Sequence, residues 1–125
     1  MPELSGNSPQ RARLEISHEP LTLNIYGITL VGELGMGSVL SLDRIIKSVF
    51  EQRIYRLVIN LEGTYYIASS GIGILVASTE IARENGGEIV FAGVTVRVKH
   101  VFDLMGLGKT LRFSANTRDA LKMLK

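Results

Sequence analysis

The sequence predicts an α/β fold, with a mixed β-sheet of about four to five strands packed against about four helices. Two kinds of segment alternate along its 125 residues. Short apolar runs rich in β-branched residues, at 56–61 and 88–92, are typical of strands covered on both faces. Longer segments between them repeat apolar residues every three or four positions, as amphipathic helices do. Such alternation after an initial hairpin favours one layered α/β domain.

The chain from residue 13 to about 35 is expected to begin the sheet. Leu14 and Ile16 alternate with polar neighbours, and the pattern resumes at Leu21 and Leu23 after a break at 18–20. This spacing predicts a hairpin that turns near Pro20. The apolar run 28–31 either extends the second strand or begins a third.

A first helix should follow, with Ser38 as its candidate N-cap. Its inner face is formed by six apolar residues at helical spacing: Val39, Leu42, Ile45, Ile46, Val49 and Phe50. After the strand at 56–61, a second helix is expected from Ser70 to Glu84. It should place Ile72 and Leu75 in or near the core. Asn85-Gly86-Gly87 should end it, since glycine readily adopts the left-handed conformation of a helix terminus.

The last part of the chain predicts a third helix over 94–105, a short edge strand at 111–113 and a final helix capped by Thr117. The third helix should direct four apolar side chains inward: Val98, Val101, Phe102 and Met105. It should end at Gly106, because a glycine there permits a helix stop.

Composition excludes several classes of protein. Hydrophobic residues make up 46% and charged residues 21%, a balance typical of a globular domain. The formal net charge of +2 and the lack of a basic cluster argue against a nucleic-acid partner. With no cysteine, the chain cannot form disulfides or cysteine-ligated metal sites. Residues 1–12 are polar and read as a flexible tail, and we expect no membrane segment and a cytoplasmic location.

Three motifs resemble known sites but lack a required residue. Gly108-Lys109-Thr110 matches the end of a phosphate-binding P-loop, yet Asp103 stands where the loop needs glycine. Gly71 and Gly73 resemble a dinucleotide-binding turn, but Val76 occupies its third small position. The two histidines lack neighbours at metal-ligand spacing. We therefore expect no catalytic residues, no cofactor and no metal.

The stretch Ala68-Ser-Ser-Gly-Ile-Gly73 joins a predicted strand to a predicted helix. A serine there should cap the helix by accepting a backbone N–H. Gly71 and Gly73 cost helix stability, but they leave the backbone bare for close approach by another surface. The positive end of the helix would also stabilise a phosphate on a serine. The turn is therefore suited to act as a switch.

The runs "LVINLEGTYYIASSGIGILV" and "ENGGEIVFAGVTVRVKHVFDLMGLGKTLRF", with Gly32-Glu33-Leu34, resemble the STAS domain of bacterial anti-sigma-factor antagonists. The resemblance covers about residues 14–124, and it implies a single STAS-type domain over 13–125. In that family a kinase that is itself the anti-sigma factor phosphorylates the first serine of the turn, and a phosphatase resets it. The resemblance makes Ser69 the phosphoacceptor, with Ser70 as the alternative.

Carried over by position, the resemblance implies a partner-binding surface at the start of the second helix and the end of the second strand. Its members are Glu33, Leu34, Gly35, Ala68, Ser69, Ser70, Gly71 and Ile72. The implied partners are a serine-kinase anti-sigma factor and a serine phosphatase. The protein is expected to be a monomer or a weak dimer, and not an enzyme.

Two positions depart from the family pattern. The family usually has aspartate before the phosphoacceptor and often after Gly-Glu-Leu, where this chain has Ala68 and Gly35. Their loss removes negative charge beside the turn. The alternative function is therefore a scaffold or adaptor in a multi-subunit signalling assembly, without phosphorylation. A third, a ligand-binding or lipid-transport accessory domain, is disfavoured because the sequence shows no added pocket or membrane element.

Overall fold

The computed structural model describes residues 14–125, which form one five-stranded sheet in the order β1-β2-β3-β4-β5. The strands are β1 (Leu14–Pro20), β2 (Ile25–Leu34), β3 (Arg56–Ile67), β4 (Glu88–Ala92) and β5 (Arg112–Ser114). The helices are α2 (Met36–Glu51), α3 (Ser69–Glu84), α4 (Val96–Leu104) and α5 (Thr117–Leu124). β1 runs antiparallel to β2 and the other pairs are parallel, which confirms the predicted α/β fold with a mixed sheet. The predicted tail over 1–12 lies outside the described residues.

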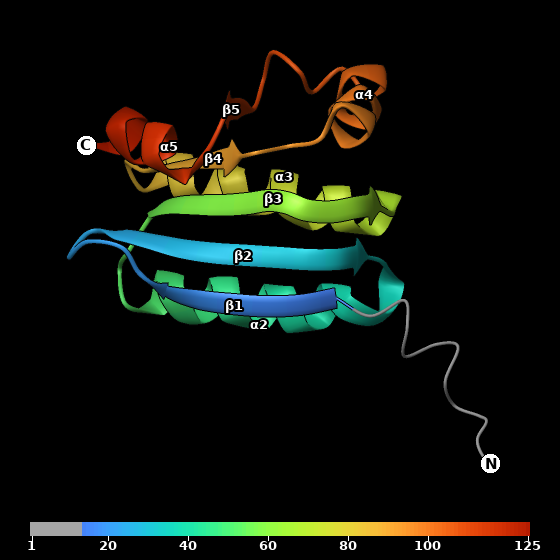
Figure 1. Ribbon diagram of the computed structural model, residues 1–125. Coiled ribbons are helices and arrows are strands. Elements are labelled where there is room, and N and C mark those ends of the chain that lie inside the picture. Colours follow the sequence, from blue (N-terminus) through green and yellow to red (C-terminus); the bar gives the residue numbers. More distant parts are fainter. Residues whose placement is uncertain (1–13) are drawn as a thin grey trace.

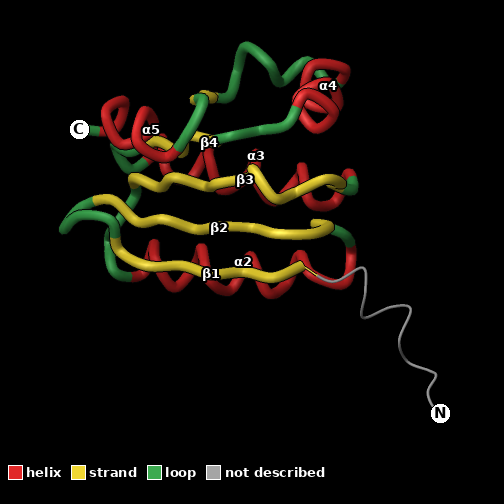
Figure 2. Tube along the Cα trace, in the orientation of Figure 1, coloured by secondary structure: helices red, strands yellow, loops and turns green. Residues whose placement is uncertain are grey.

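The helices cover the sheet unequally. α2 and α3 lie on one face, and α5 lies on the other face beside β4, as Figures 1 and 2 show. The main core fills the space under α2 and α3 and includes Leu42, Ile72 and Leu75, so the predicted core role of Ile72 and Leu75 is confirmed. A smaller core under α5 joins Val58 and Val90 to Ala120.

Several strands end and several helices begin at one end of the sheet. β2 and β3 are parallel, so their carboxyl ends meet at one edge, and α2 and α3 begin there. α4 begins at the same end, as Figure 1 shows. We call this region the carboxyl end of the sheet, the region in which α/β proteins commonly bind ligands.

The hairpin turn differs from the prediction. β1 continues through Pro20, which pairs with Tyr26, so the turn occupies residues 21–24 rather than the region of Pro20. Leu21 donates its N–H to the Ile25 carbonyl at 2.8 Å. Leu23 is therefore a turn residue, 95% exposed, and not a strand residue. Proline is tolerated at the end of an edge strand because no ladder N–H is required of it there.

Both central strands are longer than their apolar runs. The run 28–31 extends the second strand, which continues to Leu34, so no third strand begins there. β3 continues past Leu61 to Ile67 because its end pairs with β2 through Leu34 and Ile67. The register shifts twice along this pair, and Thr64 donates its buried hydroxyl to the Leu30 carbonyl at 2.6 Å.

Two predicted N-caps are displaced from their true positions. The N-cap of α2 is Gly35, and Ser38 lies within the first turn, where its hydroxyl accepts the Gly35 N–H at 3.1 Å. The N-cap of α5 is Asn116 rather than Thr117, since the Asn116 side chain accepts the Asp119 N–H at 2.8 Å.

The ends of α3 and α4 test two further predictions. Gly86 follows the end of α3 with a φ of +82°, so the predicted glycine stop is confirmed. α4 begins at Val96, not at 94, because Thr95 caps it by accepting the Val98 N–H. Met105 is the C-cap residue of α4 and is 50% exposed, so its predicted place on the inner face is wrong.

Candidate functional site

The serine turn is anchored between β3 and α3 by backbone hydrogen bonds. Ala68 donates its N–H to the Leu34 carbonyl at 2.9 Å, and its own carbonyl accepts the Ile72 N–H at 3.0 Å. The chain enters α3 directly after these bonds, and the next two residues, Ser69 and Ser70, are exposed. The turn therefore presents two hydroxyl groups on a rigid support.

Neither serine caps α3. The N-cap is Ala68, with φ −76° and ψ 161°, and its side chain has no hydrogen-bond acceptor. Ser69 and Ser70 are the first two helical residues, one and two positions too late for the capping geometry. The predicted serine cap is therefore wrong. Within residues 14–125 neither serine hydroxyl has a hydrogen-bond partner, so both are free to react or to bind.

The electrostatics at this helix start favour an anion. The first turn of α3 contains no acidic residue. Its backbone N–H groups point away from the helix without a side-chain acceptor from the N-cap, and the helix dipole places partial positive charge there. A phosphate on either hydroxyl would lie beside these groups.

The two glycines of the turn have different roles. A Cβ atom on Gly71 would lie 2.7 Å from Leu34 Cγ and 3.0 Å from the Leu34 carbonyl oxygen. Gly71 is buried, and it permits close packing of α3 on β2. A Cβ on Gly73 would meet nothing within 4 Å. The predicted bare backbone is therefore present at Gly73, whereas the close approach at Gly71 is internal to the domain.

The structure divides the predicted partner-binding residues into two groups. Leu34, Gly71 and Ile72 are buried, with Leu34 0% and Ile72 2% exposed, so they support the surface from beneath. The accessible members are Glu33, Gly35, Ala68, Ser69 and Ser70. They come from the carboxyl end of β2 and from the start of α3, which the pairing of β2 with β3 brings together.

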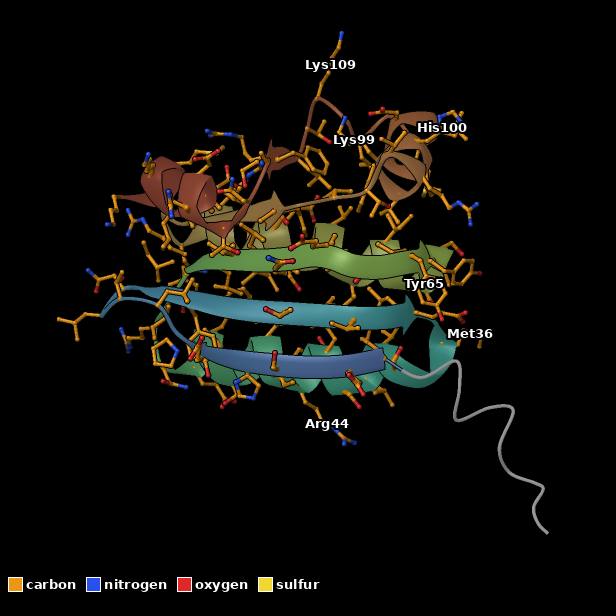
Figure 3. All side chains as sticks on the ribbon, in the orientation of Figure 1. Met36, Arg44, Tyr65, Lys99, His100 and Lys109 are labelled. Atoms are coloured by element: carbon orange, nitrogen blue, oxygen red, sulfur yellow. The ribbon has the colours of Figure 1, made fainter. Side chains whose placement is uncertain are left out.

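Several apolar side chains at element ends near the carboxyl end of the sheet are exposed, and they were not predicted from the sequence. Met36 is 84% exposed, Val96 88%, and Tyr65 and Tyr66 about half exposed. Figure 3 shows Met36 and Tyr65 at the carboxyl end of the sheet. Consecutive strand residues point to opposite faces, so the Tyr65-Tyr66 pair could have indicated an exposed aromatic ring. Apolar residues gathered at one end of a domain are typical of an interaction surface.

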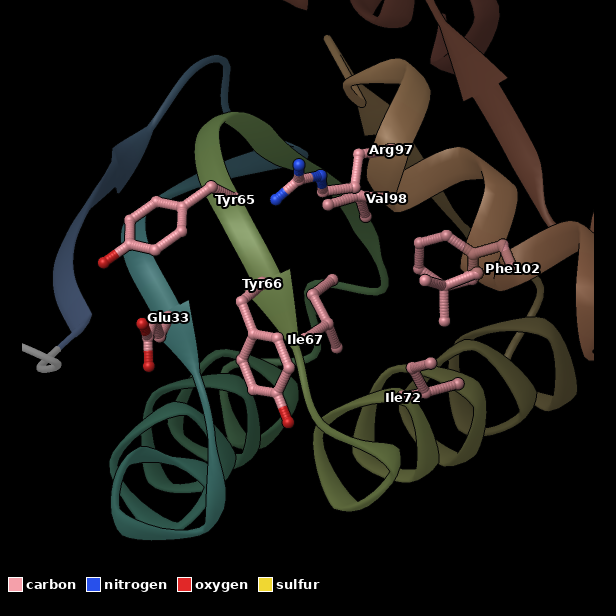
Figure 4. A pocket seen from close by; sticks show the side chains of 9 residues that line it. Glu33, Tyr65, Tyr66, Ile67, Ile72, Arg97, Val98 and Phe102 are labelled. Atoms are coloured by element: carbon pink, nitrogen blue, oxygen red, sulfur yellow. The ribbon is translucent and has the colours of Figure 1, made fainter.

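A pocket of about 400 Å³ opens beside the turn. Its walls come from the ends of β2 and β3, the start of α3 and the inner side of α4, as Figure 4 shows. Most lining side chains are apolar, and Glu33 and Arg97 supply the charged groups. Partial desolvation, together with the nearby Glu33 carboxylate, raises the pKa of Tyr65 above 10.0. This pocket was not predicted from the sequence.

The described part of the chain contains neither a metal-binding cluster nor a membrane-spanning helix. Among residues 14–125, no three His, Asp or Glu side chains are grouped so that they could hold a metal ion. In the same range, no helix has the length and apolarity needed to cross a bilayer. Gly106 ends α4 with a φ of +76°, and the Gly108-Lys109-Thr110 segment follows in an exposed loop.

Comparisons with known proteins agree with this architecture. The sequence model of the STAS domain matches residues 20–120. The anti-sigma-B factor antagonist of Staphylococcus aureus is 25% identical over 92 residues, 74% of this chain and 85% of that protein.

Two solved structures share the fold. A putative anti-sigma factor antagonist from Thermotoga maritima superposes with a TM-score of 0.81 at 13% identity, covering 87% of this chain and 93% of the other. The phosphorylated form of the Bacillus cell fate determinant SpoIIAA gives 0.72 at 22% identity, covering 87% and 98%. Since the family match spans most of the described sheet and helices, this protein belongs to the STAS domain family.

Proposed function

We propose that this protein is an anti-sigma-factor antagonist that binds a serine-kinase anti-sigma factor through the Ser69 turn and is switched by phosphorylation of Ser69. The observation that carries the proposal is the exposed hydroxyl of Ser69 at the first residue of α3, beside amide groups without a side-chain cap. The Staphylococcus relative, named as an anti-sigma-B factor antagonist, supports the choice of partner. Sigma factors act in the cytoplasm, and the proposal places this protein there.

Phosphorylation would change the surface without changing the fold. A phosphate adds about −1.5 to −2 charges at neutral pH. At the start of α3 this charge is stabilised by the helix dipole, and no acidic residue in the first turn opposes it. The unmodified turn offers small, neutral side chains to a partner. The modified turn offers a hydrated dianion that a complementary apolar or acidic surface would exclude, and a phosphatase would reverse the change.

The lack of carboxylates at Ala68 and Gly35 gives the second candidate function its specific support. An aspartate at the N-cap would occupy the amides of the first turn, whereas Ala68 leaves them available. If the kinase requires a carboxylate for recognition, the turn is no longer a substrate. The protein then acts as a scaffold or adaptor that binds its partner constitutively.

The test is calorimetric titration with candidate serine-kinase anti-sigma factors from the same organism, with ADP or ATP present. We expect the unmodified protein and Ser69→Ala to bind, and Ser69→Asp to bind at least tenfold more weakly. Ser48→Asp is the matched control, because Ser48 is exposed on α2 near the opposite end of the sheet. Circular dichroism checks that all variants remain folded.

Three outcomes separate the candidates. A loss of binding specific to Ser69→Asp supports the switch. Equal binding by all variants favours the scaffold, particularly if light scattering shows a stable large complex. Absence of binding with either nucleotide contradicts the proposed partner.

A further inference from the structure

We propose that the pocket between β3 and α4 binds a small amphiphile, a medium-chain carboxylate whose apolar chain lies in the pocket and whose head group pairs with Arg97. This inference goes beyond the proposed function, because it depends on the pocket and not on Ser69. Three features of the pocket support the inference: its volume, the apolar residues at its base and the positive charge at its mouth.

The size of the pocket suits a small molecule. Its volume of about 400 Å³ lies within the range of roughly 300–1,000 Å³ typical of ligand sites. At about 30 Å³ for each water-sized unit, it has room for on the order of a dozen non-hydrogen atoms. A carboxylate with eight to ten carbons fits that estimate, whereas a full-length phospholipid chain pair does not.

The floor of the pocket is apolar and fixed. Ile72 and Val98 are each 2% exposed, and Phe102 is fully buried, so their positions are set by the main core. Val101 forms a half-buried wall on the same side of α4. Because these side chains are held by core packing, the base of the pocket is fixed, and the apolar surface open to an alkyl chain comes mainly from Val101 and the two tyrosines.

The Arg97 guanidinium lies at the mouth of the pocket. Figure 4 shows the Arg97 guanidinium reaching from α4 toward Tyr65 across the pocket. Among residues 14–125 no carboxylate lies within ion-pair distance of Arg97. The other cation at the start of α4, Lys99, is paired with Asp103 at 3.0 Å. Arg97 is therefore available for a ligand carboxylate, which a guanidinium can bind through two parallel hydrogen bonds.

Glu33 favours one orientation of the ligand in the pocket. Its carboxylate belongs to the β2 side of the pocket and acts on Tyr65, whose pKa it raises. An anionic head group would be repelled from that side and attracted to Arg97 on the α4 side. Tyr65 and Tyr66, each about half exposed, also line the pocket beside these charges.

The experiment is a titration of the full chain, labelled with ¹⁵N, with decanoate below its critical micelle concentration, followed by amide chemical shifts. We expect saturable shifts confined to the pocket walls, residues 65–72 and 97–102. Decanol should bind the unmodified protein and Arg97→Gln equally. Decanoate should bind Arg97→Gln at least tenfold more weakly than the unmodified protein.

A second variant tests the cavity itself. Val101→Phe should fill the pocket and reduce the affinity for both decanoate and decanol at least tenfold. Ile81→Phe, a similar enlargement on exposed α3 outside the pocket, should leave binding unchanged. Lys109→Gln is the control for charge, since Lys109 projects from the loop after α4 (Figure 3). Arg97 is exposed, so its variant remains informative even if Val101→Phe is poorly folded.

Several results would overturn the proposal. They are the absence of saturable shifts, shifts spread over the whole surface, and equal decanoate affinity in Arg97→Gln. If decanoate does not bind but Val101→Phe loses the kinase, the pocket receives a side chain of a protein partner and the proposal is wrong. Ser69→Asp should bind decanoate with the same affinity as the unmodified protein. The experiments can therefore contradict the proposed ligand site and the proposed phosphorylation switch separately.

Discussion

The missing side-chain cap of α3 leads to a quantitative prediction for Ala68→Asp. Ala68 already has the extended backbone of an N-cap, and its N–H and carbonyl are bonded to Leu34 and Ile72. The substitution therefore adds a side-chain acceptor without requiring the backbone to move. The new carboxylate can accept the free N–H of Ser70 or Gly71, the positions that N-cap side chains bind.

The magnitude follows from the two interactions gained. An N-cap hydrogen bond contributes about 1 kcal/mol, and a negative charge beside the helix start about 0.3–1 kcal/mol. The expected gain in unfolding free energy is therefore about 1–2 kcal/mol. With an unfolding entropy of about 2.1 cal/mol/K per residue, a chain of 125 residues should gain about 4–8 °C in Tm. Thermal unfolding followed by circular dichroism measures this shift.

Two control variants separate capping from charge. Ala68→Asn supplies the acceptor without the charge and should keep most of the gain. Ala77→Asp places a carboxylate on the exposed face of α3, away from the free amides, and should give none. If neither substitution at Ala68 raises Tm, the amides of the first turn already have partners and the basis for phosphate binding at Ser69 is wrong.

The remaining predictions concern the packing and ionisation of the same region. Gly71→Ala should lower the free energy of unfolding by about 1–3 kcal/mol, because the new methyl group would overlap Leu34 in the strand beneath α3. Gly73→Ala should raise it by about 0.5–1 kcal/mol, because a methyl group there meets nothing. Urea unfolding measures both variants, and equal effects would contradict the close packing of Gly71 on Leu34. Leu75→Ala should cost about 2–5 kcal/mol in the same assay, since Leu75 is fully buried, and a negligible loss would contradict its place in the core. Glu33→Gln should lower the pKa of Tyr65 toward 10.0, because it removes a neighbouring negative charge. Tyrosinate absorbance, with Tyr65→Phe to identify the group, measures that pKa. The unmodified protein should keep the Tyr65 proton to higher pH than Glu33→Gln, and equal titration of the two proteins would show that Glu33 does not raise the pKa of Tyr65.

The sequence predicted the elements of the fold better than their ends. The helical spacing of Leu42, Ile46 and Val49 identified a face that the structure buries. The end of β3 could not be predicted, because polar residues follow Leu61 and only pairing with β2 keeps the strand extended. Strand length at such a point depends on a neighbour distant in sequence, which local propensity does not report.

The predicted N-caps of the helices were wrong for a related reason. At all three displaced caps, a good capping residue lay within a few positions of the true N-cap, as Ser38 does for Gly35 and Thr117 for Asn116. At the start of α3, the bond from Ala68 to the end of β2 fixes where the helix begins, although a serine follows immediately. The capping residue is thus chosen by tertiary structure among several local candidates.

The candidate site was only partly predictable. The serine turn is contiguous in sequence, so its residue types and spacing could indicate a switch. The pocket joins Glu33, Ile72 and Arg97, which lie on three separate elements, and no local pattern connects them. Apolar residues on α4 were predicted to face the core, and they do so at Val98 and Phe102, yet the same side of the helix also borders a cavity.

The central claim is that Ser69 is the site at which a serine kinase modifies and releases this protein. The most direct measurement is incubation with ATP and the serine-kinase anti-sigma factor that binds this protein, followed by mass spectrometry of the intact protein and of its peptides. We predict a single added phosphate on Ser69, lost in Ser69→Ala, and no binding of the phosphorylated protein to the kinase. A phosphate elsewhere, or none on a protein that still binds the kinase, would contradict the switch.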